Sequence, residues 1–304
     1  MSRQPEGYTL VTNIRRDTER RRVFNQLAGL VFGLDFEPWF QRGFWTDSYL
    51  PFTLFDGDVA VANASANRFT LVIHGKRHRA IQFGTVMTHP DYRGKGLASF
   101  LMRNAMDSLR DECDFFYLMG DKDALGFYRK LGFEAVPQTS YRWVPASGAL
   151  RGESPGTGRW LDMDNPQDVH ILMDLAAARE PVSMRAGVLD ATHLLTFYAL
   201  NGFGEKFWYV EKASLLAIFE QAHGVLTLHD LLFRRSIPLV DILPLLPHGP
   251  LQEVSFGFTP DRMELLPEDG LLQAEPMEMD DAFFAMPADS FGPEPFLYPP
   301  IALA

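Results

Sequence analysis

The stretch HPDYRGKGLASF, residues 89–100, decides how the rest of this sequence is interpreted. It places two glycines, an arginine and a lysine between an extended apolar run and a segment with helical periodicity. Glycines allow a sharp turn and a close approach to the main chain. The first amides of a helix lack intrahelical partners and carry partial positive charge. This combination is typical of a loop that binds a phosphate group through its backbone.

Two common phosphate loops fit this stretch poorly. In a Walker loop the lysine precedes a hydroxyl residue, whereas Lys95 precedes Gly96. A dinucleotide fingerprint needs a third glycine, and an acid at the end of the next strand. Here Ser99 replaces that glycine, and Asp114 precedes the next apolar run. A third class of phosphate-bearing ligand is therefore needed.

The patterns around the loop predict a mixed α/β unit over residues 1–150. The turn signals at 56–58 and 74–76 separate three runs that we expect to form antiparallel strands. Strands are predicted at 8–14, 49–58, 59–75, 78–90, 114–120 and 141–145. Helices are predicted at 18–33, 96–113 and 121–133, and a short aromatic-rich helix or loop at 36–45.

With these elements in place, the sequence resembles the GNAT superfamily of N-acetyltransferases. Arg93–Ala98 satisfies the family signature [QR]-x-x-G-x-[GA], and the apolar strand just upstream also matches. A second family motif, N-x-x-A-x-x-x-Y-x-x-x-G-F, is matched downstream by Asp121, Ala124, Tyr128, Gly132 and Phe133. The resemblance covers residues 8–145 well and the second half poorly, and it departs from the family pattern where aspartate replaces asparagine at position 121.

The resemblance implies the GNAT fold, a mixed sheet of α+β type, with acetyl-CoA as co-substrate. It implies that the pyrophosphate rests on the amides of residues 94–98, and that the pantetheine arm lies between two splayed strands. Tyr128 corresponds to the family tyrosine that protonates the leaving sulfur, and the amide of Val86 to the oxyanion donor. We expect Asp121 to cap a helix. The implied cofactor-binding residues are Val86, Thr88, Arg93, Gly94, Lys95, Gly96, Leu97, Ala98, Asp121 and Tyr128.

The general base and the acceptor are less defined by the sequence. The strand before the loop contains no acid, and His89 is expected at the surface. Two-part relatives similar to the mycobacterial aminoglycoside-modifying acetyltransferases bring their C-terminal carboxylate into the active site, so the carboxylate of Ala304 is a hypothesis for the base. Four aromatic residues form either an acceptor pocket or plain core: Trp39, Phe44, Trp45 and Tyr49.

Composition narrows the classes of protein. The chain has 304 residues, of which 46% are hydrophobic and 22% charged, as in globular proteins. Its net charge is −11, and the only basic run, between Arg15 and Arg22, is expected to be a solvated helix face, which argues against nucleic acid. No apolar run predicts a membrane span or a signal peptide. Cys113 is the single cysteine, so a reduced cytoplasm is expected and a cysteine-based metal site is not.

The second half is predicted to be a degenerate GNAT-like domain over residues 151–304. A Gly-, Ser- and Pro-rich linker at 146–158 precedes it. The predicted hairpin, helix and strand within 215–258 mirror those within 59–119, but the corresponding strand-to-helix junction has no glycine and contains Pro238. Beyond residue 260 the sequence is acidic and proline-rich, without a long periodic segment. We expect this half to cover the acceptor side or to form a homodimer.

The function expected from the sequence is N-acetylation of a primary amine, on a small molecule or a peptide, by direct transfer. Direct transfer is favoured because Cys113 has no evident base beside it and is expected to be a buried helix residue. A CoA-binding regulatory module without turnover is the alternative, and acyl groups longer than acetyl stay open.

Overall fold

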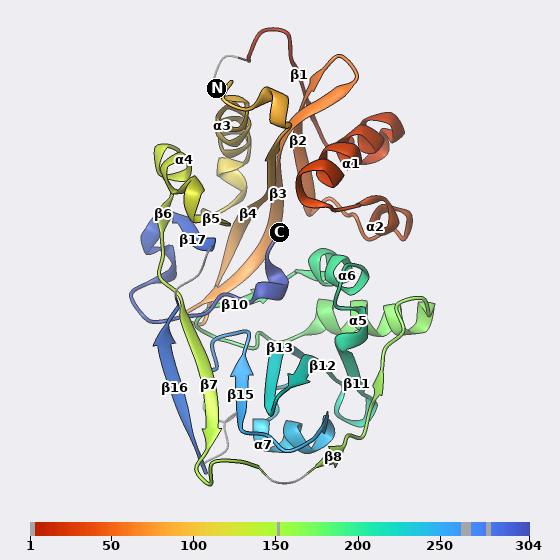
Figure 1. Ribbon diagram of the computed structural model, residues 1–304, viewed down its shortest axis with the longest axis vertical. Helices are drawn as coiled ribbons and strands as arrows, with labels where there is room; N and C mark the ends of the chain where they lie inside the picture. Colours follow the sequence, from red (N-terminus) through yellow and green to blue (C-terminus); the bar gives the residue numbers. More distant parts are fainter. Residues whose placement is uncertain (1–3, 151–152, 263–268, 278–280) are drawn as a thin grey trace.

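The computed structural model describes residues 4–150, 153–262, 269–277 and 281–304. Its described strands form two large sheets, which lie one above the other in Figure 1, and a small two-stranded sheet. Helix α6 and the C-terminal segment lie where the upper and lower halves meet (Figure 1). The predicted mixed α/β architecture is confirmed.

The upper sheet has the strand order β1-β2-β3-β4-β5-β17-β6, with β10 beside β3, in the described residues. The three central strands β2, β3 and β4 are antiparallel, as predicted, and β5 is parallel to β4. The bounds are β1 (Thr9–Thr12), β2 (Tyr49–Asp56), β3 (Val59–Ile73), β4 (Lys76–Thr88), β5 (Phe115–Asp121), β6 (Glu134–Ala135), β10 (Gly187–Leu189) and β17 (Asp281–Met286).

Four helices accompany this sheet: α1 (Thr18–Phe32), α2 (Glu37–Gln41), α3 (Leu97–Leu109) and α4 (Leu125–Lys130). The carboxylate of Asp17 caps α1 by accepting from the Arg20 amide at 3.1 Å, and Gly33, with φ +70°, ends that helix. The predicted helix at 121–133 begins only at Leu125, after a turn of 3₁₀ helix. The alanines at 62, 64 and 66 of β3 belong to the core that α3 covers.

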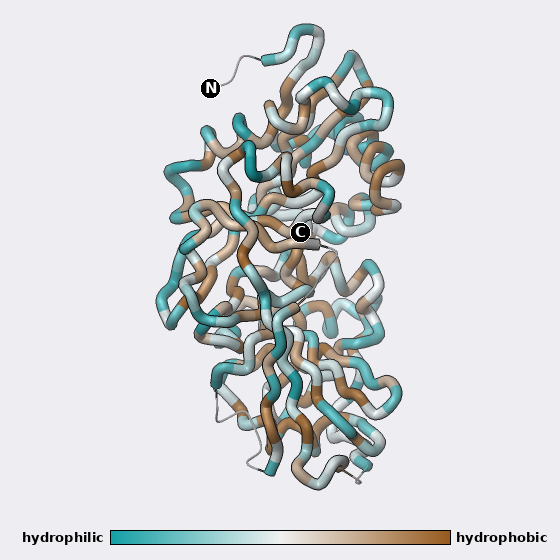
Figure 2. The backbone as a smooth tube through the Cα atoms, turned by 60° about the vertical axis from the view of Figure 1, so that its left-hand side comes forward, coloured by the Kyte–Doolittle hydropathy of each residue, from teal (hydrophilic) through white to brown (hydrophobic). Residues whose placement is uncertain are grey.

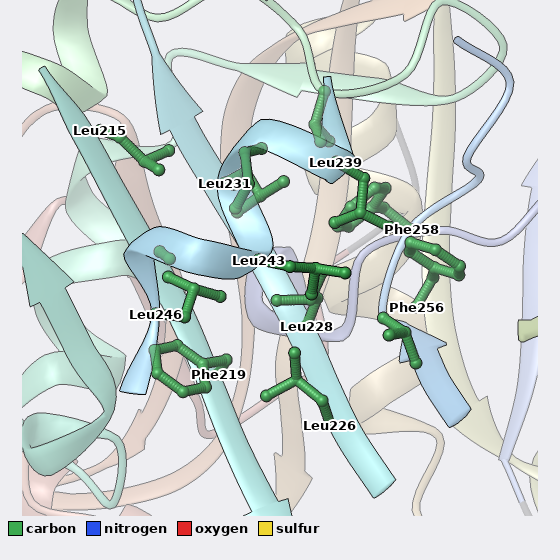
Figure 3. Close-up of a cluster of buried hydrophobic side chains, with 14 of the residues drawn as sticks. Leu215, Phe219, Leu226, Leu228, Leu231, Leu239, Leu243, Leu246, Phe256 and Phe258 are labelled. Carbon is green, nitrogen blue, oxygen red and sulfur yellow. The ribbon is translucent and has the colours of Figure 1, made fainter. Parts of the chain in front are cut away.

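The lower sheet has the order β16-β7-β15-β13-β12-β11-β9 in the described residues. Successive residues of β12 serve two cores: Leu215 and Phe219 pack in the cluster of Figure 3, whereas Leu216 and Ile218 pack under α5 and α6. The bounds are β7 (Thr139–Pro145), β9 (Arg159–Trp160), β11 (Phe207–Val210), β12 (Leu215–Ala222), β13 (Val225–Phe233), β15 (Glu253–Phe256), β16 (Gly270–Pro276), α5 (Pro166–Ala178), α6 (Thr192–Leu200) and α7 (Leu239–Ile242). The small pair is β8 (Ser154–Pro155) with β14 (Pro247–His248).

The two large sheets share the order hairpin, helix and parallel strand, in the segments where the sequence predicted it. In the upper sheet the hairpin β3–β4 is followed by α3 and by β5, which pairs parallel to β4. In the lower sheet the hairpin β12–β13 is followed by α7 and by β15, which pairs parallel to β13. The second unit lacks the phosphate-loop geometry, because α7 has four residues and begins after Pro238.

The expected division at residue 150 does not follow the sheets, because the first half gives β7 to the lower sheet and the second half gives β10 and β17 to the upper sheet. β7, which was expected to close the first unit, pairs with β15 and β16 of the lower sheet. β17 comes from the acidic tail, where no regular element was predicted, and pairs with β5 of the upper sheet. Phe283 and Phe284 are at most 1% exposed, so burial on both faces holds β17 in place.

Candidate active site

A β-bulge interrupts β4 at Thr85 and Val86. Ser65 pairs with Gly84 and Asn63 with Met87, so these two residues lie opposite the single residue between Asn63 and Ser65. Thr85 has φ +50°, a left-handed conformation that is uncommon for a β-branched residue. The bulge therefore turns two neighbouring side chains in different directions at one point of the sheet.

Next to the bulge, β4 and β5 separate. Their parallel pairing runs from Ala80–Phe115 to Phe83–Leu118, and β4 then continues to Thr88. The predicted splay of these strands is thus confirmed. The end of β4 presents a strand edge to which an extended ligand can bind through main-chain hydrogen bonds.

A network of buried polar side chains holds the bulge. The Asn63 amide nitrogen donates to the Thr85 carbonyl at 3.0 Å, and the Thr85 hydroxyl lies 3.1 Å from that of Tyr49. Thr53 donates to Asn63 at 2.8 Å, and Ser65 donates to the Tyr49 hydroxyl at 2.9 Å. Desolvation raises the pKa of Tyr49 far above its ordinary value, so this hydroxyl stays protonated.

The sequence interpretation missed Thr53, Asn63 and Ser65. For Asn63 and Ser65 the signal was present in the run VANASANRF, residues 61–69, where small polar residues occur at alternate positions of an otherwise apolar strand. Alternation places those side chains on one face of the sheet.

Beyond β4 the phosphate-loop residues lie at the surface. Gly94 and Gly96 have φ near +76° and +75°, and a Cβ built on either glycine would meet nothing within 4 Å. Gly96 is the N-cap of α3, and no described side chain caps that helix. Lys95 lies over the ring of Tyr92, with its ammonium 4.4 Å from the ring centroid. Within the described part of the chain, the first amides of α3 therefore have neither a side-chain cap nor a neighbouring atom in front of these glycines.

Tyr128 on α4 packs on the end of β5. A Cβ at Gly120 would overlap the Tyr128 ring, and the phenol is 7% exposed. Burial, with a smaller contribution from the charge of Asp121, raises the pKa of Tyr128 to about 12. The Asp121 carboxylate accepts from the Asp123 amide at 2.7 Å, in the 3₁₀ turn before α4. The prediction that Asp121 is the N-cap of this helix is wrong for α4, because its N-cap is Ala124 and no described side chain caps it.

A cavity of about 210 Å³ lies on the other side of the bulge. It is lined by Leu34, Phe36, Trp39, Tyr49, Thr85, Leu194, Phe197, Tyr198, Asn201, Leu303 and Ala304. Two of the predicted acceptor residues, Trp39 and Tyr49, are thus in the wall. Phe44 and Trp45 pack in the same aromatic cluster, 8% and 2% exposed, and are not among the lining residues.

The C-terminal segment reaches this cavity. Figures 1 and 2 both place the C-terminus in the middle of the molecule. The Tyr198 hydroxyl donates to the Leu303 carbonyl at 2.7 Å, and Gln82 donates to the Ala302 carbonyl at 3.3 Å. The main chain of Ala304 lies against Gly84 so closely that a side chain on Gly84 would overlap it. Sequence reasoning expected an apolar, buried tip, and Ile301 and Ala302 are indeed buried.

Two other reactive side chains take no part in this site. The Cys113 thiol is half-buried at the opposite end of α3 from the loop, and burial raises its pKa to about 11, which disfavours a thiolate nucleophile. The His89 ring accepts from the Asp91 amide at 3.3 Å and packs edge-on against Tyr92. Among the described residues, no cluster of three or more histidines, cysteines or acids could hold a metal ion.

Behind the cavity wall, His193 of α6 is buried in its neutral form. Its ring is stacked on Phe69 with centroids 5.1 Å apart, and burial, partly opposed by a backbone group of Asp190, lowers its pKa from 6.5 to about 4. The Trp39 indole donates to the His193 carbonyl at 3.0 Å. Protonation of His193 is therefore coupled to the packing of the cavity wall.

Replacing His193 by phenylalanine should make folding less sensitive to acid. The unfolded chain binds a proton here near pH 6.5 and the folded chain only near pH 4, so stability falls as pH decreases through this window. Between pH 7 and pH 4.5, wild type should lose roughly 2 kcal/mol of unfolding free energy more than the variant. Urea titrations at both pH values measure this, with the exposed His170→Gln variant as control. Equal losses in the two proteins would contradict it.

The comparisons with known proteins agree with this geometry. Residues 18–136 match the acetyltransferase (GNAT) domain family. No curated protein matches the chain. Among the described residues, no helix has both the length and the hydropathy needed to cross a lipid bilayer.

Solved structures share the fold across most of this chain. A conserved protein of unknown function from Enterococcus faecalis, a probable N-acyltransferase, is 15% identical with a TM-score of 0.59, covering 91% of this chain and 71% of that one. A GCN5-related N-acetyltransferase from Kribbella flavida is 19% identical with a TM-score of 0.55, covering 91% and 71%. Eis1 from Mycobacterium abscessus is 14% identical with a TM-score of 0.58, covering 88% and 72%. The part of the chain that matches the acetyltransferase (GNAT) domain family, residues 18–136, is therefore the part that contains the bulged and splayed β4 and the open start of α3.

Proposed function

We propose that this protein is an N-acetyltransferase that moves an acetyl group from acetyl-CoA directly to a primary amine. One observation carries the proposal. At the bulge, Thr85 lines the cavity, whereas its neighbour Val86 packs against the core that contains Tyr128. A thioester held at this point has a proton donor on one side and a cavity for the acceptor on the other.

The residues around the loop fit the diphosphate and pantetheine parts of CoA. Open glycines at 94 and 96 admit a phosphate to the amides of α3, and Arg93 and Lys95 add positive charge. The main chain at Val86 and Thr88 is available to an extended arm because β4 has left β5 there. Leu97 and Ala98 supply the first helical amides.

The chemistry needs three groups. The amine attacks the thioester carbonyl, so that a C–N bond forms and the C–S bond breaks. The Val86 amide donates to the oxygen on which negative charge develops. Tyr128 gives its proton to the departing sulfur, a role that suits a hydroxyl whose raised pKa of about 12 keeps it protonated. A base removes the proton that the amine loses.

For that base we retain the hypothesis drawn from the sequence, the carboxylate of Ala304. In its support, Ala304 lines the cavity together with Thr85 and lies on Gly84, next to the bulge. Tyr198 and Gln82 hold the two preceding carbonyl groups, which fixes the direction of this segment. Direct transfer is preferred to a cysteine intermediate because the pKa of Cys113 is raised.

We also propose that the lower sheet is a degenerate copy of the GNAT unit that has become part of the acceptor site. Its strand order repeats that of the upper sheet, without a usable helix N-terminus at α7. Helix α6, from the second half of the chain, contributes Leu194, Phe197 and Tyr198 to the cavity wall.

Gly96→Ala should weaken binding of acetyl-CoA roughly tenfold or more. The new Cβ enters the open space in front of α3, and alanine at φ +75° adds strain of about 1 kcal/mol. Calorimetric titration with CoA measures the affinity. Gly148→Ala is the matched control, since Gly148 also has positive φ and open space but lies far along the chain from the loop. Equal affinity in both variants would exclude the loop as the phosphate site.

Release of free thiol tests the activity as a whole. The full chain, acetyl-CoA and a panel of primary amines should give amine-dependent thiol release and an N-acetylated product by mass spectrometry. CoA that binds tightly but releases no thiol with any amine would overturn the proposed activity.

A further inference from the structure

The proposed acceptor cavity is lined mainly by aromatic and aliphatic side chains, although an amine is a polar substrate. Among the described residues that line it, no side chain carries a formal charge, and the charge in this wall is that of the main-chain carboxylate of Ala304, the proposed base. Three phenyl or indole groups face it, from Phe36, Trp39 and Phe197, together with the aliphatic chains of Leu34 and Leu194. The volume is about 210 Å³.

The polar side-chain atoms that Trp39, Tyr49 and Tyr198 bring to this wall are already engaged. The Trp39 indole donates to the His193 carbonyl and to the Thr196 hydroxyl, at 3.0 and 3.2 Å. The Tyr49 hydroxyl accepts from Ser65, and that of Tyr198 donates to Leu303. The inner wall therefore offers few groups to a hydroxyl or a second ammonium.

We propose that the acceptor is a small monoamine with an apolar body, of the size of an arylalkylamine, and that hydrophilic polyamines are excluded. This inference rests on the proposed function, because it assumes that the cavity receives the amine. An apolar cavity of about 150 Å³ admits benzene, so about 210 Å³ accommodates a benzene ring with a short aminoalkyl chain.

Magnitudes favour this choice over a polycation. Burying the ring of such an amine gains roughly 25 cal/mol for each Å² removed from water. A second ammonium in the same space loses its hydration at a cost of several kcal/mol. Cation–π attraction returns only about 0.5–2 kcal/mol, and the Phe36 face is already stacked on Phe197 with centroids 5.0 Å apart.

The test compares kcat/KM at saturating acetyl-CoA for four amines: 2-phenylethylamine, benzylamine, 1,4-diaminobutane and spermidine. We expect the two aryl amines to exceed the two polyamines by about tenfold or more. Faster acetylation of the polyamines would overturn the inference while leaving the proposed function intact. Absence of amine-dependent thiol release with any amine would overturn the proposed function itself.

Two tryptophan variants test whether the preference for aryl amines arises in this cavity. Leu34→Trp narrows it, whereas Leu30→Trp adds the same ring to an exposed position of α1, four residues earlier and outside the wall. Leu34→Trp should lower the ratio of kcat/KM for 2-phenylethylamine to that for ethylamine by roughly tenfold, and Leu30→Trp should leave the ratio unchanged. Because the readout is a ratio for one protein, partial unfolding does not change it. An unchanged ratio in Leu34→Trp would contradict the assignment.

Discussion

Replacing Tyr128 by phenylalanine is expected to lower kcat by about 10² to 10⁴, the usual contribution of a positioned general acid. The ring stays packed on Gly120 and Phe284, so only the hydroxyl proton is lost. Steady-state thiol release at saturating acetyl-CoA measures kcat, and calorimetry measures CoA affinity, which should stay within about twofold of wild type.

Tyr209→Phe is the matched control for this prediction, because Tyr209 is a half-buried tyrosine of β11 in the lower sheet. Since the pKa of Tyr128 is raised to about 12, its hydroxyl stays protonated at neutral pH. Deprotonation of this group should therefore not lower the kcat of the wild-type protein in that range. Full activity in Tyr128→Phe would remove the tyrosine from the chemistry and leave it a packing residue.

Deleting Leu303 and Ala304 is expected to lower kcat by roughly a hundredfold or more, because it removes both the proposed base and one wall of the cavity. The contacts of Ala302 with Gln82 and Tyr298 remain, so the fold and CoA affinity should be retained. Thiol release and calorimetry again separate turnover from binding.

Rescue by a small carboxylate distinguishes lost chemistry from lost shape. Added acetate should restore part of the activity of the truncated protein if a carboxylate is the base, whereas added chloride at the same ionic strength should not. Turnover that is unchanged by the deletion would exclude this segment from catalysis.

The phosphate loop and the central strands could be predicted because their signals are local. The glycines at 94 and 96 indicate a turn, and the alternation along β3 and β4 indicates extended strands. In both cases the residues that determine the conformation lie within a few positions of one another. The splay of β4 from β5 followed from the family resemblance, and the pairing that stops at Phe83–Leu118 agrees with it.

The strand exchange and the composition of the cavity could not be predicted in the same way. β17 is a six-residue segment in an acidic, proline-rich region, and only the long-range partner β5 makes it a strand. Likewise, no local pattern says that Phe197 of α6 stacks on Phe36, which is distant in sequence. From the sequence, Phe44 and Trp45 could belong to an acceptor wall. In the folded chain they are buried in the aromatic cluster beside the cavity and do not line it.

The position of β17 has a consequence for how the protein is made. The strand that covers the edge of β5 is synthesised after every described strand of the lower sheet. A ribosome therefore releases most of the chain before the CoA-binding half can be completed, and until then β5 offers an open edge to other chains. Expression of residues 1–150 alone should therefore yield a fragment that aggregates, not a small active enzyme. The two halves of the chain are expected to be synthesised and to fold as one unit.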